Sequence, residues 1–561
     1  MRSLRFHLAY KNIKRLRTIV SILARHGFRP LMETLHLTPL ISIPERLIGR
    51  KVSKAEEGLT IPVRARLAIE ELGPTFIKFG QILSTRPDVI PQEFITELLK
   101  LQDEVAPFPF KDAVKVIENQ FKKPLSELFS YVNETPIAAA SIAQVHRAIT
   151  LSGEEAVIKI QRPGIQEVVE TDIQILNFLA KLFIRYVPES RLYDPVGVVD
   201  EFSRVIRREM DFTLEASYTE RFRENFREEP RLKIPEVFWE LTGRNVLTME
   251  EVRGIKIDRV ESLRAAGMDT ENIAHLLADV FFKQVFEHGL FHGDLHSGNI
   301  FVLEENRIAL VDYGITGMID DEMRQNLADI LISFASEDFE GTVKVYQRMG
   351  ILPEDIDKTS FEREYYDIIV HYLGRPFKSV KLGELLLDYI RVAARHNIRL
   401  PRDLLLFDKC LIELEGLARL LYPDVDLLAE SEPYAEKLYK ERLTPSRILK
   451  DTAKTLSEYK ELAEEFPSQA GRIMRKIIED KVTINFAHKN LEDFMGEIDR
   501  SSNRLTFGII VAALIVGSSM VIAAETSPKV LGLPALGIVG FIIASFLGLW
   551  LAFQILRSGK F

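Results

Sequence analysis

Cysteine is almost absent from this sequence. Its 561 residues include one cysteine, Cys410, so no intramolecular disulfide can form and a cysteine-rich zinc site is excluded. The sequence also lacks low-complexity tracts and internal repeats, which argues against a repeat architecture. With 46% hydrophobic and 28% charged residues, the chain has the composition of a folded protein with a large core. Its length predicts several structural units.

Acidic residues are missing from the first 30 positions. This stretch carries a charge of +8, whereas the whole chain carries −9. The negative total argues against a protein that neutralises nucleic-acid phosphates, so we expect no nucleic-acid partner. The basic stretch therefore needs another explanation.

Apolar residues recur at helical spacing within the basic stretch, at Ile13, Leu16, Ile19, Val20 and Leu23. This pattern predicts an amphipathic helix. Such a helix can lie on an anionic membrane surface, or it can pack on the body of the protein, and both alternatives stay open. The apolar run between Arg17 and Arg25 is too short for a secretory signal.

Charged residues are also missing from two long segments near the C-terminus, Leu505–Ala524 and Val530–Leu556. Each is long enough to cross a hydrocarbon core of about 30 Å. The short connector Glu525–Lys529 predicts an antiparallel hairpin. Basic residues flank both outer ends, so the positive-inside rule places both flanks and the large N-terminal part in the cytoplasm. We expect a multi-pass protein of the inner (cytoplasmic) membrane.

Small residues recur every four positions in the second segment, at Gly540, Ala544 and Gly548. They predict a smooth stripe that another helix can approach closely. Its partner is either the first span of the same hairpin or a second copy of the protein, so a homodimer remains an alternative.

Between its ends the chain alternates helical and strand-like patterns. Helices are predicted at Thr75–Leu83 and from about Gln92 to Leu101, with Gly73 and Pro74 as a start signal for the first. Strands are predicted at four places: Glu155–Ile160, Asn245–Met249, and around Ile300–Val302 and Ile308–Val311.

A group of polar residues lies around the last two strands. His292, Asp294 and Asn299 follow the pattern H-x-D-L-x-x-x-N, and Asp312 follows in VDYG. This is the layout of a kinase catalytic loop and its metal-binding turn. Asp294 would orient or deprotonate the nucleophile, while Asn299 and Asp312 would hold Mg²⁺ against nucleotide phosphates. We expect Gly314 to allow the sharp turn after Asp312.

Lys159 lies upstream in the short apolar strand AVIKI. A lysine at this place in a kinase contacts the α- and β-phosphates and pairs with a helical carboxylate. Glu209, Asp211 and Glu215 are the candidates. Asp211 and Glu215 share a helix face, whereas Glu209 and Asp211 do not. The residues alone do not decide which of them pairs with Lys159.

An alanine-rich loop, PIAAASIAQVHRA, stands where a kinase would have its glycine-rich loop. Alanine resists the positive φ angles that glycine accepts, so we expect this loop to be stiffer over the phosphates. His146 has no metal-binding neighbour at a useful spacing, and we interpret it as structural.

Together these motifs make the sequence similar to the UbiB family of atypical kinases, also called aarF-domain kinases. The likeness runs from about Leu67 to near residue 430. The family's K-x-G-Q motif matches Lys78–Gln81, its alanine-rich loop matches Ala138–Ser141, and its E-x-D motif matches Glu209–Asp211. The segments FHGDLHSGN and DYG match its catalytic and metal-binding motifs.

The resemblance implies an α+β, two-lobed protein-kinase-like fold with a helical N-terminal extension, followed here by a C-terminal two-helix transmembrane hairpin. The expected parts are a basic amphipathic segment (1–60), an extension with the K-x-G-Q motif (61–110), an N-lobe with inserted helices (111–252), a C-lobe (253–430), a helical connector (431–504) and the hairpin (505–556).

The resemblance also implies roles for individual residues, with ATP and Mg²⁺ as cofactors. Asp294, Lys159 and Glu215 would be catalytic, and Asn299 and Asp312 would bind the metal. Lys78 and Gln81 would meet Glu209 and Asp211, occluding the groove where a protein substrate would bind. The expected nucleotide contacts are Ile137, Ala138, Ala139, Ala140, Ser141, Ile142, Ala143, Gln144, Val145, Lys159, Glu250 and Val252.

The function implied by the resemblance is that of a membrane-anchored atypical kinase or ATPase. It would support ubiquinone biosynthesis by ATP-driven handling of lipid precursors, with water as one acceptor of the phosphoryl group. Its partners would be the lipid bilayer, including anionic lipid, quinone precursors and quinone-biosynthesis enzymes. Two alternatives remain, namely a small-molecule or lipid phosphotransferase and a nucleotide-binding scaffold without turnover.

Overall fold

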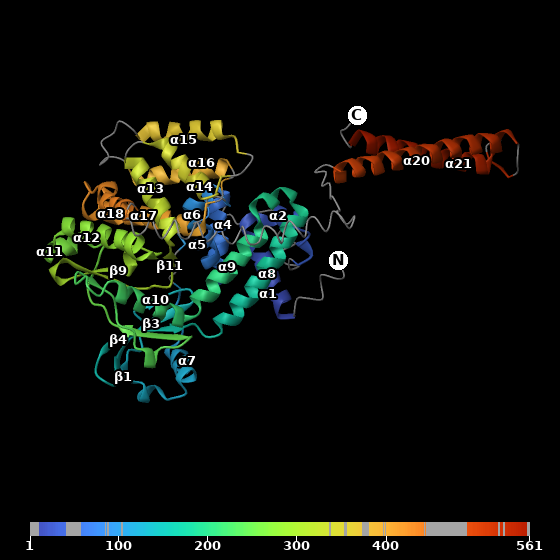
Figure 1. Cartoon of the computed structure of the whole chain (residues 1–561). Helices are drawn as coiled ribbons and strands as arrows, with labels where there is room; N and C mark the ends of the chain where they lie inside the picture. The colour runs from blue at the N-terminus through green and yellow to red at the C-terminus, as the bar shows by residue number, and fades with distance from the viewer. Residues whose placement is uncertain are drawn as a thin grey trace, which may run out of the picture. The chain divides into compact units, whose positions relative to one another are not determined.

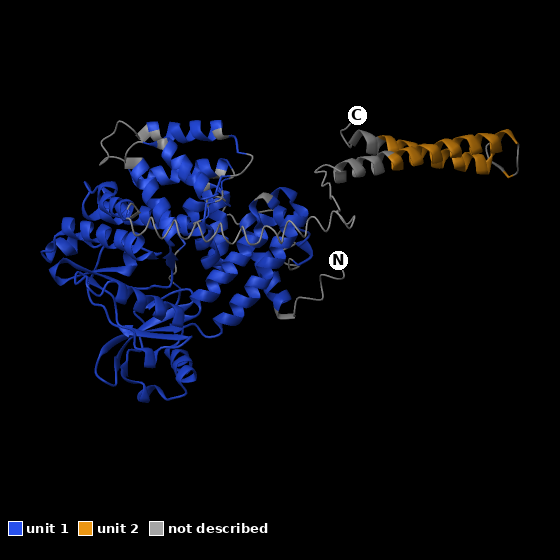
Figure 2. Ribbon diagram, viewed as in Figure 1, with its two compact units in different colours: residues 1–450 blue, residues 451–561 orange. Residues whose placement is uncertain are grey.

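Two compact units make up the chain, residues 1–450 and residues 451–561 (Figure 2). The computed structural model describes residues 10–40, 58–84, 86, 89–101, 105–335, 338–352, 356–372, 381–396, 398, 400–442, 444, 491–524, 528–530 and 533–557. Most of the predicted connector 431–504 lies outside these residues.

An antiparallel sheet is the centre of the N-terminal lobe of the first unit (Figure 1). Its strand order is β1-β3-β4-β6, and β2 pairs with β3. The predicted strands Glu155–Ile160 and Asn245–Met249 are confirmed to within one residue at each end. The five strands are β1 (Phe129–Val132), β2 (Ala138–Ala139), β3 (Ala143–Thr150), β4 (Glu155–Gln161) and β6 (Val246–Glu250).

Helices cover both faces of this sheet because its strands alternate their side chains between the faces. On one face, Ile158 and Ile160 of β4 form an apolar cluster with Ala113 and Ile117 of α7. On the other, Leu247 of β6 packs into a cluster with the inserted helices. These helices are α7 (Phe110–Phe121), α8 (Ile165–Tyr186), α9 (Pro195–Glu209) and α10 (Phe212–Asn225).

The N-terminal extension packs on the inserted helices. The predicted amphipathic helix is α1 (Tyr10–Leu23), and Ile19 and Val20 are fully buried in it. Arg15 forms hydrogen bonds to both carboxylate oxygens of Asp172 on α8, at 2.7 and 2.9 Å. Of the two alternatives for this helix, the structure therefore shows packing on the protein body.

One of the remaining helices of the extension carries the K-x-G-Q motif. Helix α4 (Ile61–Leu72) is followed by Gly73, whose φ of 98° terminates it, and α5 (Pro74–Ser84) begins at Pro74, a residue suited to a first helical position. The predicted helix Thr75–Leu83 is confirmed, and the predicted helix from Gln92 ends at Leu98 rather than at Leu101. These helices are α2 (Arg29–Thr34), α4 (Ile61–Leu72), α5 (Pro74–Ser84) and α6 (Gln92–Leu98).

The C-terminal lobe is mostly helical, with two small sheets. One has the order β5-β10-β9-β7, and the other pairs β8 with β11. The predicted strands near residues 300 and 308 are β9 and β10. The strands are β5 (Leu232–Lys233), β7 (Ile255–Lys256), β8 (Leu290–His292), β9 (Ile300–Leu303), β10 (Arg307–Leu310) and β11 (Thr316–Met318).

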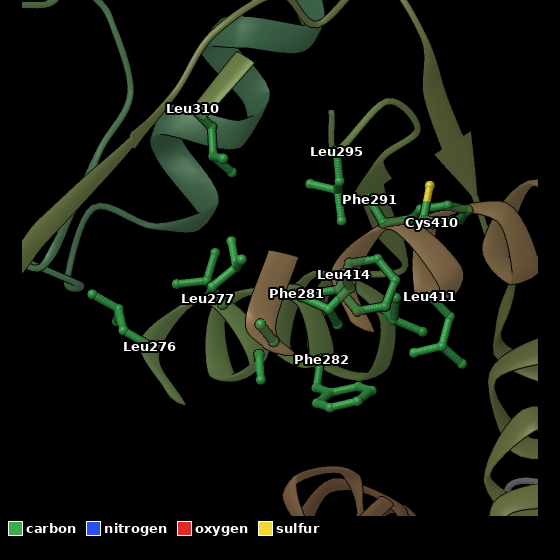
Figure 3. Close-up of a cluster of buried hydrophobic side chains, with 14 of the residues drawn as sticks. Leu276, Leu277, Phe281, Phe282, Phe291, Leu295, Leu310, Cys410, Leu411 and Leu414 are labelled. Atoms are coloured by element: carbon green, nitrogen blue, oxygen red, sulfur yellow. The ribbon is translucent and has the colours of Figure 1, made fainter. Parts of the chain in front are cut away.

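The helices of this lobe surround the largest apolar cluster, part of which Figure 3 shows. Phe281 and Phe282 of α12 pack there beside Leu411 and Leu414 of α17. The helices are α11 (Val260–Ala265), α12 (Thr270–Phe282), α13 (Asp321–Ala335), α14 (Phe339–Arg348), α15 (Lys358–Tyr372), α16 (Leu382–Arg395), α17 (Arg402–Leu421) and α18 (Leu427–Arg442).

The second unit is a helical hairpin of α20 (Leu491–Ala523) and α21 (Ala535–Arg557). Ser502–Ala523 and Ala535–Ala552 are long and apolar enough to cross a membrane. The predicted second span began at Val530, but Lys529–Val530 (β12) instead pairs with Leu533–Pro534 (β13). The second helix therefore begins about a turn and a half later than predicted.

The stripe of small residues faces the first helix of the hairpin. A Cβ atom at Gly540 would lie 2.1 Å from Ser518 Oγ of α20, and Ala544 is 1% exposed. A Cβ at Gly548 would lie 3.7 Å from Val511. Of the two predicted partners for the stripe, the structure shows the first span of the same hairpin.

Candidate active site

Lys159 lies at the centre of the candidate site, on β4. Its Nζ atom donates hydrogen bonds to both carboxylate oxygens of Glu215 on α10, at 2.8 and 2.9 Å. It also contacts Asp312 Oδ2 at 3.2 Å. Of the three carboxylates left open by the sequence, Glu215 is therefore the partner, as the family resemblance implied.

The charges of this group are set by burial and by one another. Burial lowers the pKa of Lys159, but Asp312 and Glu215 outweigh burial and raise it, so the ammonium stays charged. Burial raises the pKa of Asp312, but Lys159 outweighs it and holds this pKa well below its usual range. Burial raises the pKa of Glu215 against the attraction of Lys159. The lowered pKa keeps Asp312 ionised, which is the form in which a carboxylate would bind Mg²⁺.

The turn at Asp312 differs from the prediction. The residue with a left-handed conformation is Asp312 itself, with φ of 63°, whereas Gly314 has no positive φ. A Cβ atom at Gly314 would lie 3.1 Å from Asp312 Oδ1, and the Gly314 N–H donates to that oxygen at 3.2 Å. Gly314 therefore gives room to the carboxylate, and the strained backbone lies at the metal-ligand position, where such strain is often found.

The catalytic loop closes on itself after β8. His292 Nε2 lies 3.1 Å from the Val311 carbonyl oxygen, and the Asp294 N–H donates to His292 Nδ1 at 3.1 Å. Asn299 Nδ2 donates to the carbonyl oxygen of Asp294 at 3.1 Å and to its Oδ2 at 3.3 Å. The structure thus brings Asp294 and Asn299 together, with the amide oxygen of Asn299 available to a cation.

The donors present fit a magnesium ion that arrives with a nucleotide. Asp312 and Asn299 offer the carboxylate and amide oxygens that Mg²⁺ prefers, and this ion usually takes its remaining ligands from water and phosphate. Within the part of the chain that the structure describes, no group of three His, Cys, Asp or Glu side chains could hold a metal ion.

Two further residues contact the catalytic loop from α17. Lys409 Nζ lies 2.7 Å from Asp294 Oδ1, and the Leu295 N–H donates to Glu413 Oε2 at 3.1 Å. The sequence-based reasoning missed both, because they lie more than 100 residues from the loop. A signal did exist, namely a Lys and a Glu four residues apart in the leucine-rich segment around Cys410.

The alanine-rich loop forms β2 and the turn into β3. Ala138 pairs with Val145 and Ala139 with Gln144. Residues 137–145, all of which the structure describes, contain no positive φ angle, so alanine fits this loop. Ser141 is 1% exposed, and its hydroxyl has no hydrogen-bond partner among the described residues.

Not every residue predicted to contact the nucleotide has its side chain on the same face of the sheet as Lys159. Val145 pairs with Lys159 across the sheet, and Gln144 pairs with Ile160, so the Gln144 side chain lies on the opposite face from Lys159. Gln144 Oε1 accepts the Phe108 N–H at 3.1 Å, and its Nε2 contacts His146 at 2.7 Å. Gln144 could contact a nucleotide in this conformation only through its backbone.

His146 has the structural environment expected for it. It is fully buried, and its Nδ1 lies 2.7 Å from the Asn133 carbonyl oxygen. Burial lowers the pKa of His146, so it stays neutral.

Glu250 and Val252 lie where β6 leads out of the N-terminal sheet. The Glu250 carboxylate is bound by Lys233 at 2.7 Å and by the Glu236 N–H at 3.2 Å. Its side chain is thus engaged elsewhere, and a nucleotide contact of Glu250 would have to come from the backbone.

The K-x-G-Q motif reaches the inserted helix α9 through Lys78 and Phe79, whose ring packs edge-on against Phe202 with the centroids 5.1 Å apart. Lys78 Nζ lies 2.5 Å from Glu209 Oε1, and both side chains are nearly buried. Gln81 instead donates to the Leu101 carbonyl oxygen at 3.4 Å, and Asp211 caps α10 by accepting the Thr213 N–H at 3.2 Å. Of the four predicted occluding residues, Lys78 and Glu209 therefore form the contact.

Comparison with known proteins relates most of the chain to one family. Sequence models match an ABC1 atypical kinase-like domain at residues 100–346, a UbiB helical domain at residues 365–426, and an ABC1/UbiB kinase-like C-terminal domain at residues 489–557.

Three individual proteins are similar to the chain. The chain is 36% identical over 458 residues to a "Probable protein kinase UbiB" of Pseudomonas aeruginosa, covering 81% of this chain and 86% of that protein. It is 32% identical over 552 residues to an uncharacterised protein of the hydrogenase 1 5′ region of Clostridium pasteurianum, covering 98% and 99%. A solved structure of Mycobacterium tuberculosis Rv3197 with erythromycin is 25% identical, with a TM-score of 0.47, covering 63% of this chain and 90% of that one. The chain belongs to the UbiB family of kinase-like proteins.

Proposed function

We propose that this protein is an ATP-dependent phosphotransfer enzyme, an atypical kinase or ATPase, that supports ubiquinone biosynthesis at the membrane. The observation that carries the proposal is the convergence of Glu215 and Asp312 on Lys159, with a carboxylate oxygen of each within 3.2 Å of its Nζ atom. Protein kinases use this arrangement for phosphoryl transfer, because a lysine paired with a carboxylate binds the phosphates while an aspartate binds Mg²⁺. Asp294 then orients the acceptor.

The chain after Asp312 favours a small acceptor. Protein kinases carry a long activation segment at this point, whereas here β11 ends at Met318 and α13 begins at Asp321. Lys78 and Glu209 also join the extension to α9. We therefore propose water or a small molecule as the acceptor, rather than a protein.

The hairpin provides the reason to place this chemistry at a membrane. Precursors of isoprenoid quinones are lipids, and a cytoplasmic ATPase held at the inner membrane could use ATP to extract them or present them to soluble enzymes of the pathway. The two apolar helices, Ser502–Ala523 and Ala535–Ala552, support an anchor of this kind. Anionic lipid, quinone precursors and quinone-biosynthesis enzymes are the proposed partners.

The test is ATP turnover by the full-length protein in liposomes, with and without anionic lipid and quinone-like phenols. The label on the γ-phosphate is traced for the wild type and for Asp312→Asn. We expect metal-dependent release of inorganic phosphate that the variant lacks.

Label on a lipid or phenol would instead indicate a phosphotransferase. An absence of metal-dependent turnover under every condition would contradict the enzymatic proposal and leave a nucleotide-binding scaffold. In cells that lack their own copy, Asp294→Asn should fail to restore quinone synthesis. Full restoration would show that the pathway does not use phosphoryl transfer.

A further inference from the structure

Lys409 is held by three oxygen atoms at the catalytic loop. Its Nζ lies 2.7 Å from Asp294 Oδ1, 3.3 Å from the Gly293 carbonyl oxygen and 3.2 Å from Glu413 Oε1. An ammonium group has three donors and no acceptor, so these contacts occupy all of its hydrogen-bonding capacity. Lys409 is therefore committed to the loop rather than poised to bind a phosphate.

The helix that carries Lys409 is anchored beside the loop. Leu411 and Leu414 of α17 belong to the same buried cluster as Phe291 and Leu295, which flank the catalytic residues (Figure 3). Cys410 Sγ also lies 3.4 Å from the His292 carbonyl oxygen. Because close-packed side chains have few alternative positions, the helix defines where the ammonium lies.

Glu413 supports the same arrangement from the next turn of the helix. One of its carboxylate oxygens contacts Lys409, and the other accepts the Leu295 N–H at 3.1 Å. A lysine and a glutamate four residues apart thus hold consecutive residues of the loop, Gly293 to Leu295.

The two oxygens of Asp294 consequently have different environments. Oδ1 receives the strong contact with Lys409, whereas Oδ2 has longer contacts, at 3.3 Å to Asn299 and 3.4 Å to His296. Charge-assisted bonds are the stronger kind, so Oδ1 is already engaged and Oδ2 remains able to receive the acceptor's hydrogen.

We propose that Lys409 is a positioning residue for phosphoryl transfer, fixing Asp294 so that Oδ2 faces the acceptor. In the step it serves, the acceptor oxygen bonds to the γ-phosphorus while its proton passes to Oδ2. The bond from that phosphorus to the β–γ bridging oxygen breaks, and ADP leaves with the electron pair. The proposal rests on the phosphotransfer function proposed above, and it makes a helix of the UbiB helical domain, residues 365–426, part of the active site.

Turnover of Lys409→Met, measured in the full-length protein, tests this role. Misplacing a reacting group by about 1 Å costs about 10²-fold in rate, so we expect a loss of this size with unchanged nucleotide affinity. Lys409→Arg keeps the charge and should recover part of the turnover. Lys437→Met is the matched control, because Lys437 is also a helical lysine paired with a carboxylate, Glu287, at 2.8 Å, but is 58% exposed.

The same substitution in an Asp294→Asn protein distinguishes a positioning role of Lys409 from a general effect on stability. If Lys409 acts through Asp294, then Lys409→Met should cause no further loss in an Asp294→Asn protein. An equal loss in both backgrounds would overturn the proposal. Normal turnover of Lys409→Met, or an arginine variant no better than the methionine variant, would overturn it as well.

Hydrogen exchange does not depend on enzymatic activity, so it can test the role of Lys409 even if the proposed function is wrong. Hydrogen exchange of the amides in residues 293–295 should be faster in Lys409→Met, while exchange in β4 stays unchanged. If the wild type shows no turnover, the proposed function fails, and the exchange rates alone decide whether Lys409 holds the loop. Unchanged exchange in residues 293–295 would then contradict the positioning role.

Discussion

Asp408 lies on α17, one residue before Lys409, and faces the interior instead of the catalytic loop. It is 3% exposed, and its Oδ2 has no hydrogen-bond partner in the described part of the chain. Burial raises the pKa of Asp408 to about 8, so the folded protein keeps this carboxyl group protonated at neutral pH. An unpaired charge in such a place would be costly.

The raised pKa predicts a pH-dependent stability. Between about pH 4 and pH 8 the folded state keeps a proton that the unfolded state releases, so this group's contribution falls by at most about 1.4 kcal/mol per pH unit as the pH rises. Asp408→Asn replaces the group by a neutral one. We expect the variant to lose part of the pH dependence and to unfold at a higher temperature than the wild type above about pH 8. Thermal unfolding of both proteins across this pH range checks the prediction. If the unfolding temperatures of the two proteins changed with pH in parallel, the prediction would be contradicted.

At the scale of elements, α5 is held against α9 by one nearly buried ion pair, and it packs closely on Leu101, which follows α6. Lys78 meets Glu209 at 2.5 Å, and a Cβ atom at Gly80 would lie 2.5 Å from the Leu101 side chain. The glycine of the K-x-G-Q motif thus serves close packing of the helix, while the lysine makes the contact across helices.

Lys78→Ala should loosen this contact. Removing one partner of a buried ion pair typically costs about 3–5 kcal/mol, because the other charge remains buried. We expect a lower unfolding temperature and a changed nucleotide affinity, measured by thermal unfolding and titration with an ATP analogue. Lys115→Ala is the control, since Lys115 pairs with Asp112 at 2.8 Å on the exposed surface. Equal behaviour of the two variants would contradict an occluding role for Lys78.

The hairpin gives a second prediction at this scale. A Cβ atom at Gly537 would lie 2.5 Å from Ile522 Cγ1 and 3.1 Å from the Ser518 carbonyl oxygen, so Gly537→Ala should push α21 away from α20. At Gly517 a Cβ atom would meet nothing within 4 Å, and Gly517→Ala should leave the spacing unchanged. Distances between spin labels on the two helices, in lipid, measure the difference. An unchanged distance in Gly537→Ala would show that the helices do not pack as described.

At the scale of the molecule, the candidate catalytic residues and the two apolar helices belong to different units. The catalytic, metal and occluding candidates all lie in residues 1–450, and both apolar spans lie in residues 451–561. Each unit has its own packing, so the first should keep its fold without the second.

A chain that stops before Leu491 tests this division. We expect it to move from the membrane pellet to the soluble fraction and to keep basal ATP turnover, while it fails to restore quinone synthesis in cells. Fractionation, phosphate release and quinone content measure the three effects. Retention of the truncated chain in a carbonate-washed pellet would contradict the assignment of the hairpin as the anchor.

The sequence by itself determined the features that depend on residues close together in the chain, namely the motif residues and the uncharged segments. Asp294, Asn299 and Asp312 were identifiable because a catalytic loop and its metal-binding turn need these residue types at nearly fixed separations. The two spans followed from uncharged length, since a hydrocarbon core admits few charges. The two-lobed fold followed from the family motifs.

Tertiary structure decided which of several equally suitable groups meet. It selected Glu215 among three carboxylates for Lys159, packed α1 on the protein body, and placed Lys409 of α17 against Asp294. It also placed the left-handed residue of the metal-binding turn at Asp312. These contacts join segments far apart in the chain or depend on the packing around them, so local residue patterns do not specify them. These contacts are instead specified by the burial of the apolar faces that hold the segments together.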